Sequence, residues 1–180
     1  SSPAAFEKAN IVIISINCDI KKINRKLQVN LVDFKKSIIE VAKRIKERTL
    51  IIVQSTVPPG TCDKIVKTTI KHFFLKRKLN PDNVYIAHSY ERVTPGKNYL
   101  NSIVNNWRVY SGINKKSANK CKKFLKTIIN VKKYPLKKLE NTNSSELSKL
   151  MENSYRAVNI AFVDEWNKLA EKMGIDLFEV

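Results

Sequence analysis

Glycine, cysteine and histidine are scarce in this sequence, and each shortage disfavours a class of site. Only four glycines are present, and none forms the G-x-G-x-x-G pattern of a dinucleotide-binding turn. The three cysteines (Cys18, Cys62 and Cys121) are widely separated and form no C-x-x-C pair. That spacing indicates reduced thiols in a cytoplasmic setting and argues against structural zinc. With only two histidines in the chain, we expect no metal site.

Long hydrophobic runs are missing too. No apolar run approaches the roughly 18 residues of a membrane span. The first residues lack the charged and apolar regions of a signal peptide. We therefore expect no membrane association.

Positive charge, in contrast, is abundant, with a formal net charge of +18. The lysines are spread over nearly every segment, and the densest runs are KFLKTIINVKKYPLKK and KHFFLKRK. Neither run has the interleaved glycines and aromatics of a single-strand binding surface. Charge of this size favours anionic ligands and non-specific polyanion binding, but it indicates no specific nucleic acid partner.

Apolar, β-branched runs alternate with helical patterns along the chain. Buried strands are predicted at residues 10–16, 50–54, 84–87, 107–111 and 131–134. Helices are predicted at residues 31–45, with Asn30 as the cap, and at residues 62–78 and 114–129, whereas residues 17–29 and 88–106 are expected to be loops. This alternation predicts an α/β fold with βαβ units and a parallel sheet covered on both faces.

Two unusual segments follow predicted strands. STVPPGT begins at Ser55, and HSYERVTPG begins at His88. In parallel sheets, ligands bind at the carboxyl ends of the strands. Either segment alone could be an ordinary turn. We expect the first three strands to be parallel, with Thr56 and Glu91 at the same edge of the sheet.

A helix of about 30 residues is predicted from Ser144 to Met173. Thr142, Asn143 and Ser144 offer capping oxygens, Glu146 could complete a capping box, and Gly174 follows the last turn. Lys149, Asn153 and Arg156 share one stripe of this helix at i, i+4 and i+7 spacing. The stripe is either an active-site wall or a solvated polar face.

Both ends of the sequence look cut. The chain opens almost directly on a core strand, and it closes on Asp176 to Val180, where a capping box and an apolar face begin. We therefore expect an internal fragment of a longer protein.

The motifs STVPPGT, SYERVTPG, WRVYSGI and SSELSKLMENSYRAVNIAFVDEWNKLAEKMGIDLFEV resemble those of the UDP-glucose/GDP-mannose dehydrogenase family. The match is most similar to the branch that oxidises UDP-N-acetylhexosamines. The resemblance implies the second half of a Rossmann-like, doubly wound parallel sheet over residues 1–140. Residues 141–180 would begin a central helical dimerisation domain. The resemblance also implies NAD as cofactor and a homodimer. The implied reaction oxidises a nucleotide sugar, of UDP-N-acetylhexosamine or UDP-glucose type, to the uronic acid through a cysteine thioester.

The resemblance implies functional roles for residues of this sequence only where its motifs match those of the family. Catalytic roles are implied for Thr56 and Glu91, which orient water, and for Lys149 and Asn153, which stabilise the oxyanion. The implied cofactor contacts are Ser55, Thr56, Cys18 and Glu91. The implied substrate contacts are Arg92, Val93, Lys149, Asn153 and Arg156.

Departures from the family pattern concern the cofactor and the nucleophile. Tyr90 replaces a proline, and Cys18 replaces a cofactor-contacting threonine. The glycine-rich loop and the cysteine nucleophile segment are absent from the sequence, so we expect residues 1–180 to be inactive alone. The alternative function is a basic α/β module that binds nucleic acid or another polyanion without catalysis.

Overall fold

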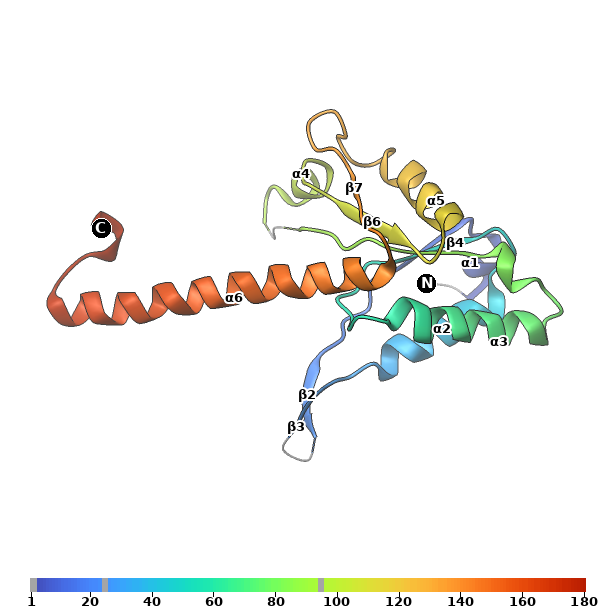
Figure 1. The fold of residues 1–180 in the computed structure, drawn as a ribbon, viewed down its shortest axis with the longest axis horizontal. Coiled ribbons are helices and arrows are strands. Elements are labelled where there is room, and N and C mark those ends of the chain that lie inside the picture. The colour runs from blue at the N-terminus through green and yellow to red at the C-terminus, as the bar shows by residue number, and fades with distance from the viewer. Residues whose placement is uncertain (1–2, 24–25, 94–95) are drawn as a thin grey trace.

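A five-stranded sheet with helices on both faces forms the body of the molecule (Figure 1). The computed structural model describes residues 3–23, 26–93 and 96–180. The strand order is β1-β4-β5-β6-β7. The strands span Ile11–Ile14 (β1), Leu50–Val53 (β4), Tyr85–His88 (β5), Val109–Gly112 (β6) and Lys137–Lys138 (β7). The predicted α/β class is confirmed.

The first three strands of the sheet are parallel, as predicted. In register, β1 pairs Ile14 with Val53 of β4, and β4 pairs Val53 with His88 of β5. Buried apolar side chains fill both faces of β4. All three strands therefore end at one edge of the sheet.

Strand β6 runs antiparallel to β5, which differs from the all-parallel expectation. A parallel pair needs a crossover that returns the chain to the other edge. Here the connection stays at the carboxyl edge, where Ser89 Oγ donates to the Val109 carbonyl oxygen over 2.7 Å. Part of this predicted loop forms the short helix α4 (Tyr99–Val104), while Thr94 and Pro95 lie outside the described residues.

Helices cover the two faces of the sheet separately. The helices α2 (Val32–Arg44) and α3 (Thr68–Lys76) pack on one face around Phe34, Ile38, Ile51 and Phe74. Helix α5 (Lys115–Leu125) packs on the other face. A short helix, α1 (Pro3–Lys8), precedes the first strand.

Some predicted boundaries were wrong. The helix expected at 62–78 begins with a π-helical turn, Cys62–Lys67, and ends at Lys76. The strand expected at 131–134 is absent from the described chain, because local turns satisfy that backbone; for example, Tyr134 N donates to the Asn130 carbonyl oxygen over 2.9 Å. The last strand lies at Lys137–Lys138 instead.

The polar loop expected at 17–29 contains a β-hairpin of Ile20–Ile23 (β2) and Lys26–Val29 (β3). Asn24 and Arg25 of this predicted loop lie outside the described residues. Ile20 and Leu27 are exposed, so the hairpin buries little apolar surface. Its strands therefore lack the continuous apolar run by which the buried strands were predicted. The hairpin projects from the sheet (Figure 1).

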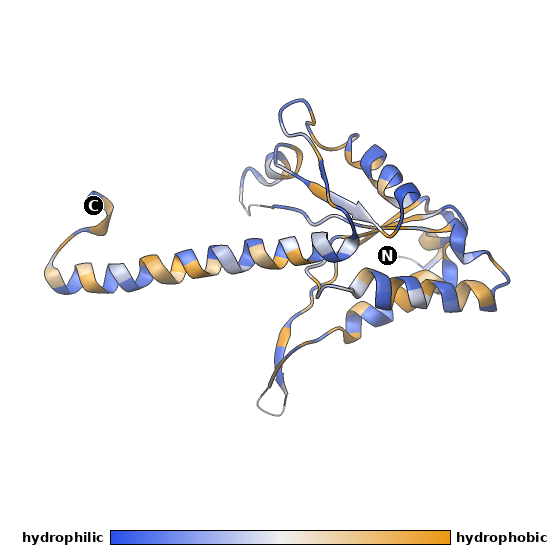
Figure 2. Cartoon of the chain, viewed as in Figure 1, coloured by the Kyte–Doolittle hydropathy of each residue, from blue (hydrophilic) through white to orange (hydrophobic). Residues whose placement is uncertain are grey.

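Helix α6 (Thr142–Met173) extends from the sheet for most of its length (Figure 1). Asn141 caps it by accepting from Ser144 N, and Gly174 follows it with φ 69° in the left-handed region, as expected for a helix end. Beyond its first turns the helix leaves the body, and Figure 2 shows apolar residues along its projecting part. Within the described residues, no helix is both long and apolar enough to cross a membrane.

Candidate active site

Three loops leave the same edge of the sheet. They follow β1, β4 and β5, and they carry Cys18, Thr56 and Glu91 respectively. Because Val53 and His88 are register partners, Thr56 and Glu91 each lie three residues beyond the same level of the sheet. The prediction that these two residues share one edge is confirmed.

Ser55 ties the ends of β1 and β4 together. Its hydroxyl accepts from Ile16 N over 2.8 Å and donates to the Ile14 carbonyl oxygen over 3.4 Å. The residue is buried, whereas its neighbour Thr56 is half-buried. The hydroxyl of Ser55 is therefore engaged inside the fold.

Cys18 makes a local contact within the first loop. Its thiol donates to the Ile16 carbonyl oxygen at a distance of 3.6 Å. Burial, and to a lesser extent the charge of Asp19, raises the pKa of this thiol above its usual value. A thiol held in this way is a poor nucleophile.

The turn after β4 is stiff. Pro58 and Pro59 fix the backbone, Gly60 has φ 94°, and the Thr61 hydroxyl donates to the Pro58 carbonyl oxygen over 2.7 Å. At the end of the turn, Gly60 N and Cys62 N donate to the carboxylate of Glu146 over 2.6 and 2.8 Å. Glu146 thus caps a helix other than its own, and the predicted capping box was wrong.

Burial dominates the chemistry of Glu146. The residue is 0% exposed, and burial raises the pKa of its carboxyl group above the usual value. The backbone N–H groups of Cys62 and Gly60 act in the opposite direction, because they stabilise the charged form.

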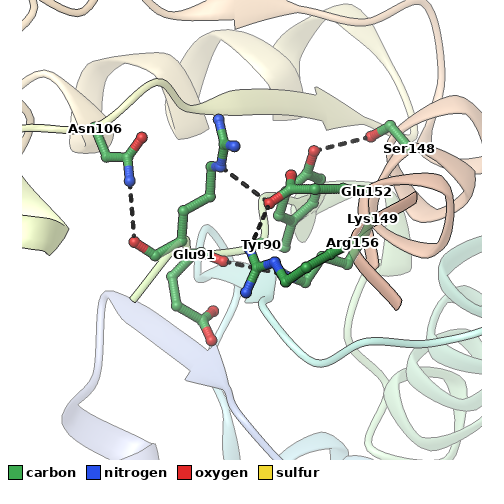
Figure 3. A network of polar contacts seen from close by, with 8 residues as sticks. Tyr90, Glu91, Asn106, Ser148, Lys149, Glu152 and Arg156 are labelled. Atoms are coloured by element: carbon green, nitrogen blue, oxygen red, sulfur yellow. Dashed lines mark hydrogen bonds and ion pairs between the residues drawn. The ribbon is translucent and has the colours of Figure 1, made fainter. Parts of the chain in front are cut away.

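Tyr90 lies where α6 meets the loop after β5 (Figure 3). Its side chain is 5% exposed, and its hydroxyl accepts from Ser148 Oγ over 3.3 Å. The ring contacts the Lys149 side chain, with the ammonium nitrogen 5.0 Å from the ring centroid. A cation over an aromatic face is attracted by the ring quadrupole.

Lys149 reaches from α6 to the loop that carries Glu91. Its Nζ donates to the Glu91 backbone oxygen over 3.4 Å (Figure 3). Burial lowers the pKa of Lys149 from its usual value, while the charges of Glu152 and Glu91 oppose that shift. The predicted stripe of α6 therefore faces the loop at Lys149.

Two arginines share the carboxylate of Glu152. Arg92 Nε lies 3.0 Å from Glu152 Oε1, and Arg156 Nη2 lies 3.6 Å from the same oxygen. The backbone oxygen of Arg92 accepts from Asn106 Nδ2 over 3.2 Å. Glu152 thus pairs with both predicted substrate arginines; Figure 3 shows Glu152 and Arg156 beside the loop that carries Glu91.

The remaining predicted residues differ in exposure. Val93 is half-buried at the end of the described loop. Asn153 is exposed on α6, one turn beyond Lys149. The structure therefore brings Thr56, Glu91 and Lys149 to one edge of the sheet, and it leaves Asn153 at the surface of the helix.

Sequence reasoning missed Arg108. This residue, immediately before β6, is 4% exposed, and its Nη1 is buried without a hydrogen-bond partner in the described chain. Glu91 Oε2 is buried and unpartnered in the same sense. Desolvation lowers the pKa of Arg108, and the charge of Glu91 is the largest influence that raises it. Two orphaned groups of opposite charge therefore lie near each other at this edge, where a polar ligand atom or water could satisfy them.

A buried polar cluster anchors α6 to the sheet. His88 Nδ1 lies 2.9 Å from Ser145 Oγ, and Ser111 Oγ lies 2.6 Å from the same atom. Burial lowers the pKa of His88 to about 4, so the imidazole is neutral at pH 7. The apolar pattern of α6 gave no signal for these contacts.

The fold and its edge define a Rossmann-type α/β class of protein, in which ligands bind at the carboxyl ends of parallel strands. The model of the UDP-glucose/GDP-mannose dehydrogenase family, NAD binding domain, matches residues 1–129. The model of the central domain of the same family matches residues 143–180. The chain therefore belongs to the UDP-glucose/GDP-mannose dehydrogenase family.

Individual relatives agree with this assignment. A UDP-N-acetyl-D-mannosamine dehydrogenase of Methanocaldococcus jannaschii is 37% identical over 174 residues, which are 96% of this chain and 37% of the relative. One from Campylobacter jejuni is 29% identical over 97% of this chain and 42% of its own length. The chain thus spans about two fifths of the length of these relatives.

Solved structures share the fold. The UDP-D-ManNAc dehydrogenase of Pyrococcus horikoshii superposes with a TM-score of 0.82 and 27% identity, over 99% of this chain and 40% of that one. A UDP-glucose dehydrogenase of Pyrobaculum islandicum superposes with a TM-score of 0.81 and 20% identity, over 98% of this chain and 38% of that one. The second likeness concerns the fold alone.

Proposed function

We propose that the natural protein containing these residues oxidises a nucleotide sugar at its primary alcohol to the uronic acid, with NAD as the acceptor. The observation that carries the proposal is the meeting of Thr56, Glu91 and Lys149 at the carboxyl edge of the sheet. These residues come from three separate family motifs, and their position near the carboxyl ends of parallel strands, where such sheets usually bind ligands, supports the proposal.

The cofactor contacts that this chain can offer are partial. The 180 residues contain no glycine-rich loop, so they supply only one wall of a dinucleotide site. Thr56 is the side chain available at that wall, since the Ser55 hydroxyl and the Cys18 thiol already bond to backbone groups. We infer that Ser55 and Cys18 contact the cofactor through backbone atoms. NAD, when bound, accepts hydride from the sugar carbon.

Lys149 and Asn153 suit the stabilisation of negative charge. Lys149 is already held by Tyr90 and by the Glu91 backbone, so little reorganisation is needed when an oxyanion forms beside it. Asn153 lies one turn further along the same helix. Glu91 and Thr56 would orient the water that hydrolyses the thioester.

The nucleophile is not supplied by a cysteine of this chain. Burial raises the pKa of Cys18 and of Cys62, and raises that of Cys121 to about 12. None is a thiolate near neutral pH, and thioester chemistry needs one. We therefore expect residues 1–180 alone to form no sugar acid.

The substrate class is a UDP-N-acetylhexosamine, with UDP-glucose as the second possibility. Arg92 and Arg156 lie beside a groove of about 500 Å³ on α6 that also holds Tyr155 and Asn159. The Glu152 carboxylate lines the same groove and pairs with both guanidinium groups, so one positive charge remains in excess and favours an anionic ligand such as a nucleotide diphosphate. Val93 and Lys149 would complete the contacts.

The assembly and the division into domains follow the family. We infer that residues 1–140 belong to the NAD-binding domain and residues 141–180 to a central helical domain that forms a homodimer. The family models support this division, because one ends at residue 129 and the other begins at residue 143.

The activity is tested by NAD reduction with purified natural protein. UDP-N-acetyl-D-mannosamine, UDP-glucose and GDP-mannose are compared as substrates, with the uronic acid identified by mass spectrometry. We expect two molecules of NADH for each acid formed, with UDP-N-acetyl-D-mannosamine preferred. Absence of NADH with all three sugars would contradict the proposal.

A further inference from the structure

The carboxylate of Glu146 joins the two parts of the site. It is 0% exposed, it lies on the second turn of α6, and its two oxygens accept from Gly60 N and Cys62 N. Those donors end the turn that begins at Thr56. One side chain therefore connects segments that are more than 80 residues apart in sequence.

Helix stability alone does not explain this carboxylate. The helix that contains Glu146 is already capped by Asn141, whose side chain accepts from Ser144 N. Burying a charge is unfavourable unless hydrogen bonds compensate it. Here the donors Gly60 N and Cys62 N lie at the start of the helical segment Cys62–Lys67. They form charge-assisted hydrogen bonds with the carboxylate, and the positive end of that segment's helix dipole also stabilises the negative charge.

We propose that Glu146 is a positioning residue that sets the spacing between Thr56 and Lys149. This inference rests on the proposed function. Lys149 lies three residues after Glu146 on a continuous helix, and Gly60 lies four residues after Thr56 in a turn stiffened by two prolines. Both connections are rigid, so a change at the carboxylate moves the two groups relative to each other.

The consequence is a selective effect on turnover. Thr56 and Lys149 act at the reacting carbon, and misplacement of about 1 Å at such groups costs up to about 10²-fold in rate. The arginines that hold the nucleotide sugar are fixed by Glu152 and not by Glu146. Loss of the hydrogen bonds from Gly60 N and Cys62 N to Glu146 should therefore lower kcat, while KM for the nucleotide sugar changes little.

The kinetic test compares Glu146→Gln and Glu146→Ala with Glu171→Gln, a change at an exposed glutamate on the same helix. Glutamine keeps the shape and one acceptor, so we expect kcat to fall about 10-fold in Glu146→Gln, and further in Glu146→Ala, with KM within about twofold. The Glu171→Gln control should match wild type. Folded Glu146 variants with unchanged kcat would overturn the proposal, and so would an effect on KM alone.

Hydrogen exchange tests the contact of Glu146 with Gly60 N and Cys62 N without an activity measurement. Pro58 and Pro59 carry no N–H, so a peptide over residues 57–62 reports mainly on Gly60, Thr61 and Cys62. In wild type the Gly60 and Cys62 amides should exchange slowly, and Glu146→Gln should speed their exchange about 10-fold, whereas Thr61 N donates to the Pro58 carbonyl oxygen and should change less. Fast exchange in the wild type would overturn the proposal even if the variants fail to fold. If no nucleotide sugar reduces NAD, the proposed function fails, and this exchange still decides whether Glu146 holds the turn.

Discussion

The ammonium group of Lys149 lies 5.0 Å from the centre of the Tyr90 ring. The resemblance of the SYERVTPG segment to the family motif implies a proline at the position of Tyr90, so by that comparison the contact is particular to this sequence. A proline would offer no aromatic face. The contact holds Lys149 beside the Glu91 backbone, where the proposed chemistry needs a fixed donor.

Removing the Tyr90 ring should weaken the site through Lys149. A cation–π contact of about 1 kcal/mol corresponds to roughly a fivefold effect, so we expect Tyr90→Leu to lower kcat by about that factor. Because the ring stabilises the ammonium form, its loss should also move the alkaline limb of the kcat–pH profile to lower pH. Tyr90→Phe keeps the ring and should behave like wild type. Equal losses in the two variants would show that the ring is not responsible.

Lys149→Ala should reduce turnover more strongly. The variant removes a donor that acts mainly on the oxyanion, and such losses are on the order of 10²-fold in kcat. Steady-state NADH formation by the natural protein measures it. Lys138→Ala, at an exposed lysine of β7, is the matched control and should leave kcat unchanged. A Lys149→Ala enzyme with wild-type kcat would remove Lys149 from the mechanism.

The buried His88 should make stability depend on pH. Its pKa falls from 6.5 to about 4 on burial, so the folded state binds fewer protons than the unfolded state between these values. Its contribution is full above pH 6.5 and is lost as the pH falls towards 4. We expect about 2 kcal/mol of the unfolding free energy to disappear between pH 7 and pH 4.5 for this reason.

Denaturant unfolding at the two pH values isolates the His88 effect. His88→Asn keeps a polar atom towards Ser145 and should lose about 2 kcal/mol less than wild type over this range. His72→Asn, at the exposed second histidine, should lose as much as wild type. Identical pH dependence in all three proteins would contradict a neutral, buried His88.

Helix α6 should mediate self-association. Val158, Phe162, Trp166 and Leu169 are exposed on one stripe, and contiguous apolar surface of this kind marks interfaces. Light scattering in moderate salt should detect a dimer. Phe162→Glu should weaken this self-association by about 30-fold or more in Kd, whereas Asp164→Lys, two residues further along and on the other side of the helix, should not. A wild-type monomer at micromolar concentration would contradict this prediction.

The strands that consist of continuous buried apolar residues could be predicted from the sequence. Residues 50–54 and 84–87 are continuous hydrophobic segments, and both are strands close to the expected places. The edge that carries Thr56 and Glu91 followed from the parallel order of these strands. Periodicity and strand-end position carry this information locally, so it can be read without a structure.

Features that depend on distant partners could not be predicted. Glu146 matched a local capping box by its spacing, yet its donors lie on another segment. The reversed direction of β6 depends on the 89–108 connection staying at the carboxyl edge of the sheet, and the hydrophobic pattern of a strand does not show the direction in which it runs. Arg108 looked like an ordinary strand residue, because its burial beside Glu91 is a property of the folded edge.

We propose that Glu91 helps water to release a covalently bound sugar from the enzyme. The natural protein carrying Glu91→Gln is incubated with UDP-N-acetyl-D-mannosamine and NAD, and its intact mass is measured. Because hydrolysis should slow while NAD reduction proceeds, we expect a covalent sugar–enzyme adduct to accumulate, with acid formation strongly reduced. No adduct, together with undiminished acid formation, would show that Glu91 is only a structural residue of the loop.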